Sequence, residues 1–104
     1  MQAYLVTFYT QQDRVHANMP LANWIFAQAE KLDLEGATMT AAIAGRGHDK
    51  KQHAINMFDL SEQPVQISMV LREEEMRRLF EHLEKERVKV FYTTALVDCG
   101  MLGE

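Results

Sequence analysis

The sequence contains one cysteine and two prolines in 104 residues, and it has no long apolar run. One thiol cannot form an internal disulfide, and a thiol left reduced suits the cytoplasm. The longest apolar run is far short of the ~18 residues that a membrane-spanning helix needs. The first residues enter an expected strand directly, without the basic and apolar segments of a signal peptide. We therefore expect a cytoplasmic protein that does not insert into membranes.

Basic residues are also scarce. Lys and Arg number 11 against 15 Asp and Glu, which gives a net charge of −4 and a pI near 5.5. Proteins that bind nucleic acid neutralise its phosphates with a basic stripe. The only basic cluster here consists of Arg46, His48, Lys50 and Lys51. This cluster is too small for a duplex but sufficient for one small phosphorylated ligand, so nucleic acid is not expected as a partner.

The remaining composition is that of an ordinary globular protein, with 47% apolar and 25% charged residues in a single domain spanning residues 1–104. β-Branched residues, aromatic residues and alternating polarity predict four strands, at residues 3–10, 37–44, 65–71 and 88–97. Apolar residues at helical spacing predict two helices, Leu21–Leu32 after Pro20 and Glu73–Lys85. The composition of residues 45–51 predicts a loop, and a short extended piece is expected within 53–58.

The resulting order, β-α-β followed by a loop and β-α-β, indicates a ferredoxin-like α+β sandwich. Right-handed crossovers place both helices on one face of a four-stranded antiparallel sheet and leave the other face open. The first and last predicted strands are apolar on both of their sides. An exposed apolar sheet face of this extent marks a partner surface, and self-association is the simplest explanation. We expect a homo-oligomer.

Several ordered sequence blocks run from one end of the chain to the other. They are Phe8–Arg14 with His16, Pro20-Leu21 with Trp24, Gly36–Thr38, Gly45-x-Gly47-His48-Asp49 with His53-Ala54, Asp59-Leu60, Gln63–Val65, Phe91-Tyr92, Val97-Asp98-x-Gly100 and Leu102–Glu104. In these blocks the chain resembles the uncharacterised bacterial PII-like family, which is related to the nitrogen regulatory PII proteins. The chain departs from PII proteins at residues 84–87, which replace their glycine-rich phosphate loop, and in a shorter loop between strands two and three.

The resemblance implies a PII-like ferredoxin fold that usually assembles as a trimer. It also implies a signalling or regulatory protein that binds an adenine nucleotide, or a similar phosphorylated metabolite, in clefts between subunits. In PII proteins the loop between strands two and three is flexible and contacts partner proteins. A regulated protein target is therefore a further expectation.

The segment between the second and third predicted strands is the strongest candidate for a ligand site. Two glycines spaced by one residue let the backbone approach a ligand closely, and successive N–H groups there can form a nest for an anion. The neighbouring cations would add charge for a phosphate. The candidate ligand-binding residues in this segment are Gly45, Arg46, Gly47, His48, Lys50, Lys51 and His53. The alternative is a surface turn whose charges are simply solvated.

Arg14 is a further candidate ligand-binding residue. It belongs to the segment Asp13–His16, which follows the first strand and precedes the first helix. We expect this segment at the end of the sheet where the third strand stops, close to a helix N-terminus that could attract an anion. The alternative is a loop in which Asp13 and Arg14 pair with their neighbours.

Two other functions remain open. His48, Asp49 and His53 have the chemistry to hold Zn²⁺ or Cu²⁺, as in a divalent-metal-binding protein of the trimeric CutA type. A small cofactor-free enzyme would instead need an enclosed pocket beside the sheet, lined by Trp24, Phe26 or Phe91. The sequence has no nucleophile elbow, Walker loop or Cys-x-x-Cys pair, and Cys99 has no histidine close in sequence. We therefore expect a binding protein rather than an enzyme.

Overall fold

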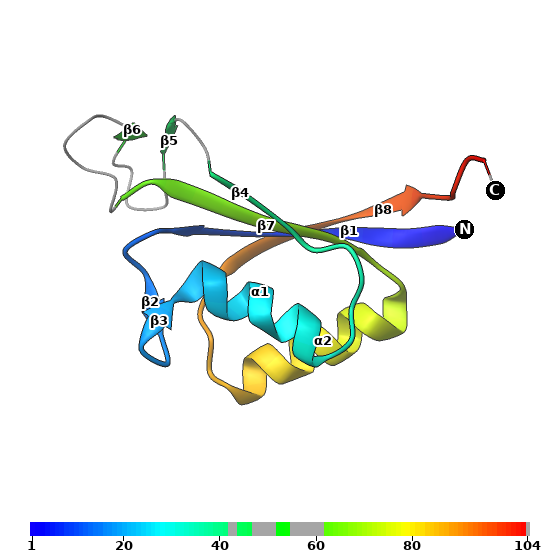
Figure 1. Ribbon diagram of the computed structural model, residues 1–104, viewed down its shortest axis with the longest axis horizontal. Coiled ribbons are helices and arrows are strands. Elements are labelled where there is room, and N and C mark those ends of the chain that lie inside the picture. The colour runs from blue at the N-terminus through cyan, green and yellow to red at the C-terminus, as the bar shows by residue number, and fades with distance from the viewer. Residues whose placement is uncertain (42–43, 47–51, 55–61, 104) are drawn as a thin grey trace.

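A computed structural model describes residues 1–41, 44–46, 52–54 and 62–103. Its centre is a four-stranded antiparallel sheet with the strand order β4-β7-β1-β8. The strands are β1 (Gln2–Gln11), β4 (Thr38–Ala41), β7 (Pro64–Leu71) and β8 (Phe91–Asp98). Both helices, α1 (Leu21–Lys31) and α2 (Glu73–Lys85), lie on the same side of this sheet (Figure 1). The predicted ferredoxin-like fold is confirmed.

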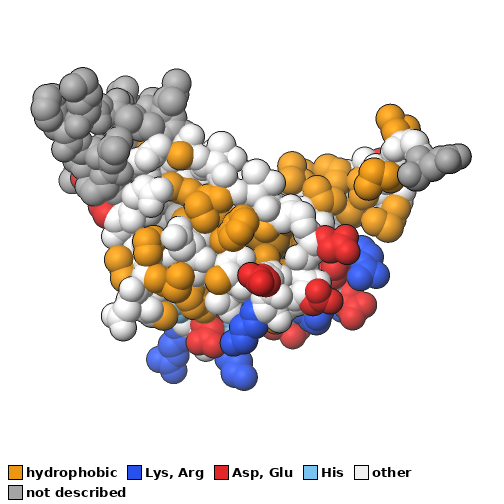
Figure 2. Space-filling view, in the orientation of Figure 1, with side chains coloured by type: hydrophobic (Ala, Val, Ile, Leu, Met, Phe, Trp, Pro, Cys, Tyr) orange, Lys and Arg blue, Asp and Glu red, His pale blue; other side chains and the backbone are white. Residues whose placement is uncertain are grey.

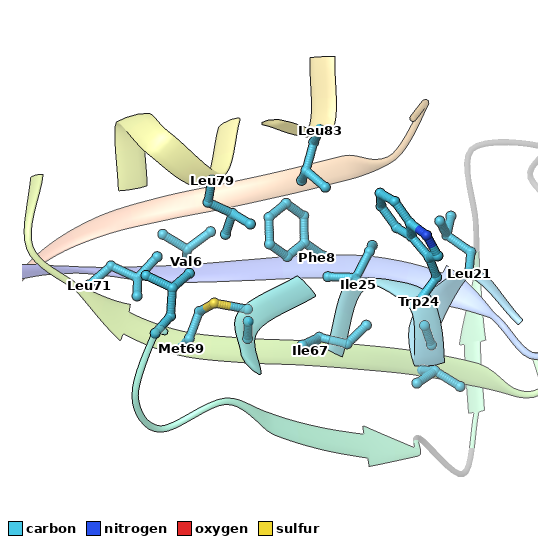
Figure 3. Close-up of a cluster of buried hydrophobic side chains, with 14 residues drawn as sticks. Val6, Phe8, Leu21, Trp24, Ile25, Ile67, Met69, Leu71, Leu79 and Leu83 are labelled. Atoms are coloured by element: carbon cyan, nitrogen blue, oxygen red, sulfur yellow. The ribbon is translucent and has the colours of Figure 1, made fainter. Parts of the chain in front are cut away.

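The sheet and the helices enclose one hydrophobic core. On β1 and β7, every second side chain faces the helices, including Val6, Phe8 and Ile67, all of which are buried. Trp24 and Ile25 of α1 pack against them in the same cluster, together with buried leucines of α2 (Figure 3). This alternation has the period of two that a strand with one covered face requires. Phe26 of the same helix lies outside this core and is 40% exposed.

Two short hairpins accompany the sheet. The sequence indicated neither pairing, although the short extended piece expected within 53–58 overlaps the second strand of the second hairpin. In the first, β2 (Val15–His16) pairs with β3 (Met19–Pro20) through a turn whose two residues, Ala17 and Asn18, both have positive φ. The second consists of β5 (Ala44–Arg46) and β6 (Gln52–Ala54). The predicted loop is therefore wrong for Gly45 and Arg46, which belong to a strand, and residues 47–51 lie outside the described residues.

The last strand begins three residues later than predicted because residues 86–90 complete the end of α2. The N–H of Arg87 donates to the carbonyl of Glu84, and the N–H of Val88 donates to that of Leu83 (both 3.0 Å). These two bonds form a Schellman motif, in which the chain reverses through a residue in the left-handed region. That residue is Arg87, with a φ of 57°. Val88 and Val90 then pack partly buried against the core instead of joining the sheet.

The start of α2 is fixed by a carboxylate. Oε1 of Glu75 accepts hydrogen bonds from the backbone N–H of Arg72 (2.9 Å) and from its side-chain Nε (3.2 Å). The hydrogen bond from the Arg72 side chain lowers the pKa of Glu75 below its ordinary value of 4.5. The bond to the backbone satisfies an N–H group that precedes the first turn of the helix, so this helix begins where the sequence predicted.

The side of the sheet away from the helices is called here the open face. Its side chains are those of Ala3, Leu5, Thr7, Tyr9, Thr38, Thr40, Gln66, Ser68, Val70, Phe91, Thr93, Ala95 and Val97. None of these residues, all of them described, carries a charge. The pairing register places one row of hydroxyl residues across all four strands, in the order Thr38, Ser68, Thr7 and Thr93. The face is therefore uncharged rather than uniformly apolar, which corrects the sequence-based description.

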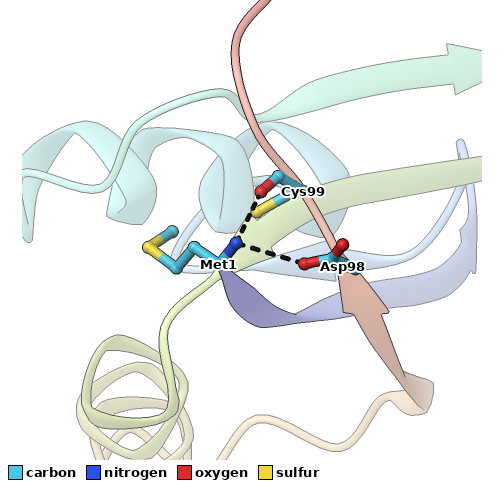
Figure 4. Close-up of polar contacts among 3 residues, drawn as sticks. All are labelled: Met1, Asp98 and Cys99. Atoms are coloured by element: carbon cyan, nitrogen blue, oxygen red, sulfur yellow. Dashed lines mark hydrogen bonds and ion pairs between the residues drawn. The ribbon is translucent and has the colours of Figure 1, made fainter.

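The two ends of the chain meet at one end of the molecule. The first residues of β1 and the last residues of β8 project beyond the helices as an arm (Figure 1). The ammonium group of Met1 donates to Oδ1 of Asp98 (3.1 Å) and to the carbonyl of Cys99 (3.0 Å) (Figure 4). Hydrophobic side chains gather on this arm, whereas Lys, Arg, Asp and Glu gather on the helical side (Figure 2). Neither of the helices in the described residues is long and apolar enough to cross a membrane.

Candidate functional site

The β5–β6 hairpin brings three of the predicted ligand-binding residues together. Gly45 pairs with His53, and Arg46 pairs with Gln52. The hairpin follows closely on β4, which ends at Ala41 on one edge of the sheet. Gly47, His48, Lys50 and Lys51, the other predicted residues of this segment, lie outside the described residues. Because Gly45 is part of an extended ladder, any anion nest in this segment would have to start after Arg46.

A second group of side chains lies at the same end of the sheet. Thr40, Gln66, Tyr9 and Phe91 form one row across the open face, from the β4 edge to the β8 edge. The rings of Tyr9 and Phe91 are 5.6 Å apart and tilted by 50°, and the hydroxyl of Tyr9 lies 3.0 Å from Oγ1 of Thr93. Phe91 is 50% exposed. This end of the open face therefore offers aromatic surface together with hydrogen-bonding groups.

Arg14 is anchored to the protein backbone. Its Nη2 donates to the carbonyl of Lys89 (2.6 Å), and its own carbonyl accepts the N–H of Leu21 (2.7 Å). These bonds favour the alternative in which Arg14 pairs with its neighbours. The segment also lies where β7 begins and not where it stops, since the N–H of Gln12 bonds to the carbonyl of Gln63. The expected position was wrong because β7 runs antiparallel to β1, so the end of β1 meets the start of β7.

A chain of aromatic and polar contacts links the β2–β3 hairpin to both helices, and the sequence did not indicate it. The ring of His16 stands edge-on to Trp24 at 4.3 Å, and the ring of His82 lies parallel to Trp24 at 6.0 Å. Buried Gln28 donates from Nε2 to the carbonyl of Trp24 (3.2 Å), which turns its Oε1 toward Nε2 of His82 (2.6 Å). An amide oxygen can only accept, so Nε2 of His82 carries the proton in this bond.

The described residues provide no site that supports the metal-binding alternative or the enzymatic alternative. Among the described residues, no group of three or more His, Cys, Asp and Glu side chains is placed to hold a metal ion. His48 and Asp49 lie outside that set. Trp24 is buried in the core, Phe91 lies on the open face, and Phe26 borders an open depression of about 250 Å³ beside α1. The depression beside Phe26 is therefore open rather than enclosed, and neither Trp24 nor Phe91 lines it.

Sequence comparison matches most of the chain to one family of proteins. A family model, DUF190 (Uncharacterized ACR, COG1993), matches residues 3–98. A UPF0166 protein of Aquifex aeolicus is 31% identical over 81 residues, which cover 77% of each chain.

Solved structures of PII-like proteins are also similar in fold. A candidate PII-like signaling protein from Thermus thermophilus superimposes with a TM-score of 0.68 and 21% identity, covering 93% of this chain and 88% of its own. CPII, a nitrogen regulatory PII-like protein from Thiomonas intermedia bound to ADP, AMP and bicarbonate, gives a TM-score of 0.71 at 12% identity, covering 97% and 91%. The chain therefore belongs to the DUF190 family, and its fold is that of the PII-like proteins.

Proposed function

We propose that the protein is a PII-like regulatory protein that binds an adenine nucleotide, or a similar phosphorylated metabolite, in clefts between the copies of a homotrimer. The observation that carries the proposal is the likeness in fold, over 97% of this chain, to a PII-like protein with ADP and AMP bound. Binding would alter the segment between β4 and β7 and thereby the affinity for a regulated protein target. No catalytic step belongs to this function.

The open face supports the assembly. A sheet face exposed to water in a chain with 25% charged residues would carry several Lys, Arg, Asp or Glu side chains. The open face instead carries partly exposed Leu5, Val70 and Phe91 (37%, 45% and 50%). Covering this face with the same face of other copies removes apolar area from water without desolvating any charge. Symmetric self-association therefore fits this surface.

The ligand-binding residues in this proposal are those of the segment between β4 and β7. Arg46, Lys50 and Lys51 would bind phosphate oxygens, and Gly45, Gly47, His48 and His53 complete the proposed set. Arg14 would contribute long-range attraction for the anion, because its guanidinium is already bonded to Lys89.

Calorimetric titration with AMP, ADP, ATP and cyclic dinucleotides tests the proposal, with the assembly measured by light scattering. We expect a trimer and micromolar or tighter binding of at least one adenine nucleotide. Arg46→Ala should weaken that binding about tenfold, because one charge-assisted phosphate contact is lost. Arg77→Ala is the matched control, since Arg77 is an exposed arginine of α2 that pairs with Glu73 (3.7 Å). A wild-type protein that binds none of these nucleotides would refute the proposal.

A further inference from the structure

The open depression beside α1 lies on the helical side of the molecule and is called here the α1 depression. It is lined by Phe26, Ala29, Glu30, Asp33, Leu34 and Ala37. Ala29 and Leu34 are buried and form its floor, whereas the phenyl ring and the two acidic residues are exposed. Its volume of about 250 Å³ is below the ~300–1,000 Å³ of a small-molecule site. The α1 depression is therefore suited to one side chain of a larger partner.

Phe26 supplies an apolar wall for such a side chain. Trp24, two residues earlier, faces the core and is 8% exposed, whereas Phe26 is 40% exposed. Positions two apart in a helix lie on different faces, so the ring stands on the solvent side of α1. The flat face of an aromatic ring attracts a cation, and a guanidinium group stacks on it. Phe26 therefore favours a partner side chain that is both planar and positive.

Glu30 and Asp33 supply negative charge to the same depression. Neither carboxylate has an ion-pair partner among the described residues. Glu30 lies in the last turn of α1, and Asp33 follows the helix end. Negative charge is unfavourable there, because the unpaired carbonyl groups already make the C-terminal end of a helix negative. A cation bound between the two carboxylates would relieve this repulsion.

The acidic surface extends from the end of α1 to the start of α2. The pKa of Arg72 is raised chiefly by its hydrogen bond to Glu75, and the charges of Glu74 and Glu35 add to the effect. These two carboxylates are therefore close enough to Arg72 to act on it. Figure 2 shows acidic side chains beside hydrophobic surface on this side of the molecule. Such a surface attracts basic partners and repels acidic ones.

From the ring, the two carboxylates and the size of the depression, we propose that the α1 depression docks a protein partner through an arginine side chain. The guanidinium group would stack on Phe26 and donate hydrogen bonds to Glu30 and Asp33. Arginine fits better than lysine because its planar group can stack and bind carboxylates at the same time. This surface lies on the side of the sheet opposite the open face, so the proposed assembly leaves it accessible. The inference does not depend on nucleotide binding.

NMR titration of the ¹⁵N-labelled protein tests the proposal. The probe is a heptapeptide of glycine and serine with one central arginine, and the reference peptide has citrulline at that position, which keeps the shape but lacks the charge. We expect the arginine peptide to shift amide signals of residues 26–37 and the citrulline peptide to bind at least about tenfold more weakly. Equal binding of the two peptides, or shifts only elsewhere in the protein, would overturn the proposal.

Three variants separate a built site from general attraction by negative charge. Phe26→Leu, which keeps an apolar side chain, should weaken binding of the arginine peptide about threefold, and Glu30→Gln about tenfold. Glu84→Gln is the matched control, since it removes an exposed carboxylate at the far end of α2 and should leave the affinity unchanged. Equal losses in the two glutamate variants, or full affinity in Phe26→Leu, would refute the proposal.

A third probe separates a protein partner from a small cation. Arginine amide carries the same guanidinium group without the flanking peptide. We expect it to shift the same amide signals but to bind more weakly than the peptide, because a partner also contacts the surface around the depression. If arginine amide binds as tightly as the peptide, the α1 depression is a site for a small cation and the protein partner is refuted. Titration of the same samples with ADP examines the proposed function separately.

Discussion

Two residues that end the helices have the backbone conformation that favours glycine. Arg87 follows α2 with a φ of 57°, and Asp33 follows α1 with a φ of 58°. At both positions the same pair of backbone hydrogen bonds closes the helix; for α1 these run from Asp33 to Glu30 (3.0 Å) and from Leu34 to Ala29 (2.7 Å). A side chain with a Cβ is strained in this region, whereas glycine is not. Both helix ends therefore hold residues that cost some stability.

Arg87→Gly should raise the free energy of unfolding by about 0.5–1 kcal/mol, because removing Cβ relieves the left-handed conformation by more than the added freedom of the unfolded chain costs. Urea denaturation measures the change. Arg87→Ala is the control, since it removes the same charge but keeps Cβ, and it should give no gain. Equal stabilisation by both variants would show that the charge, and not the backbone, is responsible.

A polar bridge links the two helices beside their apolar and aromatic contacts. Gln28 of α1 is buried, and its amide joins the carbonyl of Trp24 to the ring of His82 on α2. Both groups of the amide are thus satisfied within the protein. Loss of one partner would leave the other partly buried without a hydrogen bond, which costs more than the bond itself contributes.

Gln28→Leu and His82→Leu should each lower the free energy of unfolding by about 1–2 kcal/mol. The double variant should lose less than the sum of the two, because neither unpaired group is then left behind. Thermal and urea denaturation of the four proteins complete the double-mutant cycle. Strictly additive losses would mean that the two side chains do not interact.

Helices and strands whose apolar residues repeat at a regular spacing were predicted from the sequence more accurately than the shorter elements. In α2, Met76, Leu79 and Leu83 repeat at helical spacing beside a capping carboxylate, and both ends of this helix were predicted correctly. The two-residue strands Val15–His16 and Met19–Pro20 are too short to show a period, and their turn at Ala17 and Asn18 lacks the usual glycine. Short hairpins of this kind therefore cannot be recognised from the periodicity of the sequence.

Parts of the candidate site could not be predicted from the sequence either. The pairing of Gly45 with His53 was not indicated by the sequence, because composition predicted a loop at Gly45 and gave no partner for the extended piece that begins at His53. The contacts of His16 and His82 with Trp24 join three elements far apart in the chain. Nothing in the local pattern around His82 signals this, apart from its place three residues after buried Leu79. Contacts between residues this far apart in the chain can be identified only once the fold is known.

At the scale of the whole molecule, the described residues of the open face include no Lys, Arg, Asp or Glu, whereas such side chains gather over the helices (Figure 2). A buried charge without a partner is strongly unfavourable. An assembly through the open face should therefore be sensitive to a single added carboxylate there.

Val70→Glu should convert the proposed oligomer into monomers at micromolar concentration, as measured by light scattering, while circular dichroism stays unchanged. Val70 is 45% exposed in the isolated chain, so the carboxylate is tolerated there and becomes costly only on assembly. Val15→Glu is the matched control, because Val15 is 66% exposed in β2, away from the open face. An intact oligomer in Val70→Glu would place the subunit interface elsewhere.

The position of the single thiol has a practical consequence. Cys99 is partly exposed and hydrogen-bonded to Met1 on the projecting arm, at the opposite end of β8 from Phe91. A maleimide dye would therefore attach once per chain, without mutagenesis, far from the residues proposed to hold the nucleotide. Energy transfer between dyes on different chains would then report the exchange of subunits in real time, and the same labelled sample could be titrated with nucleotide.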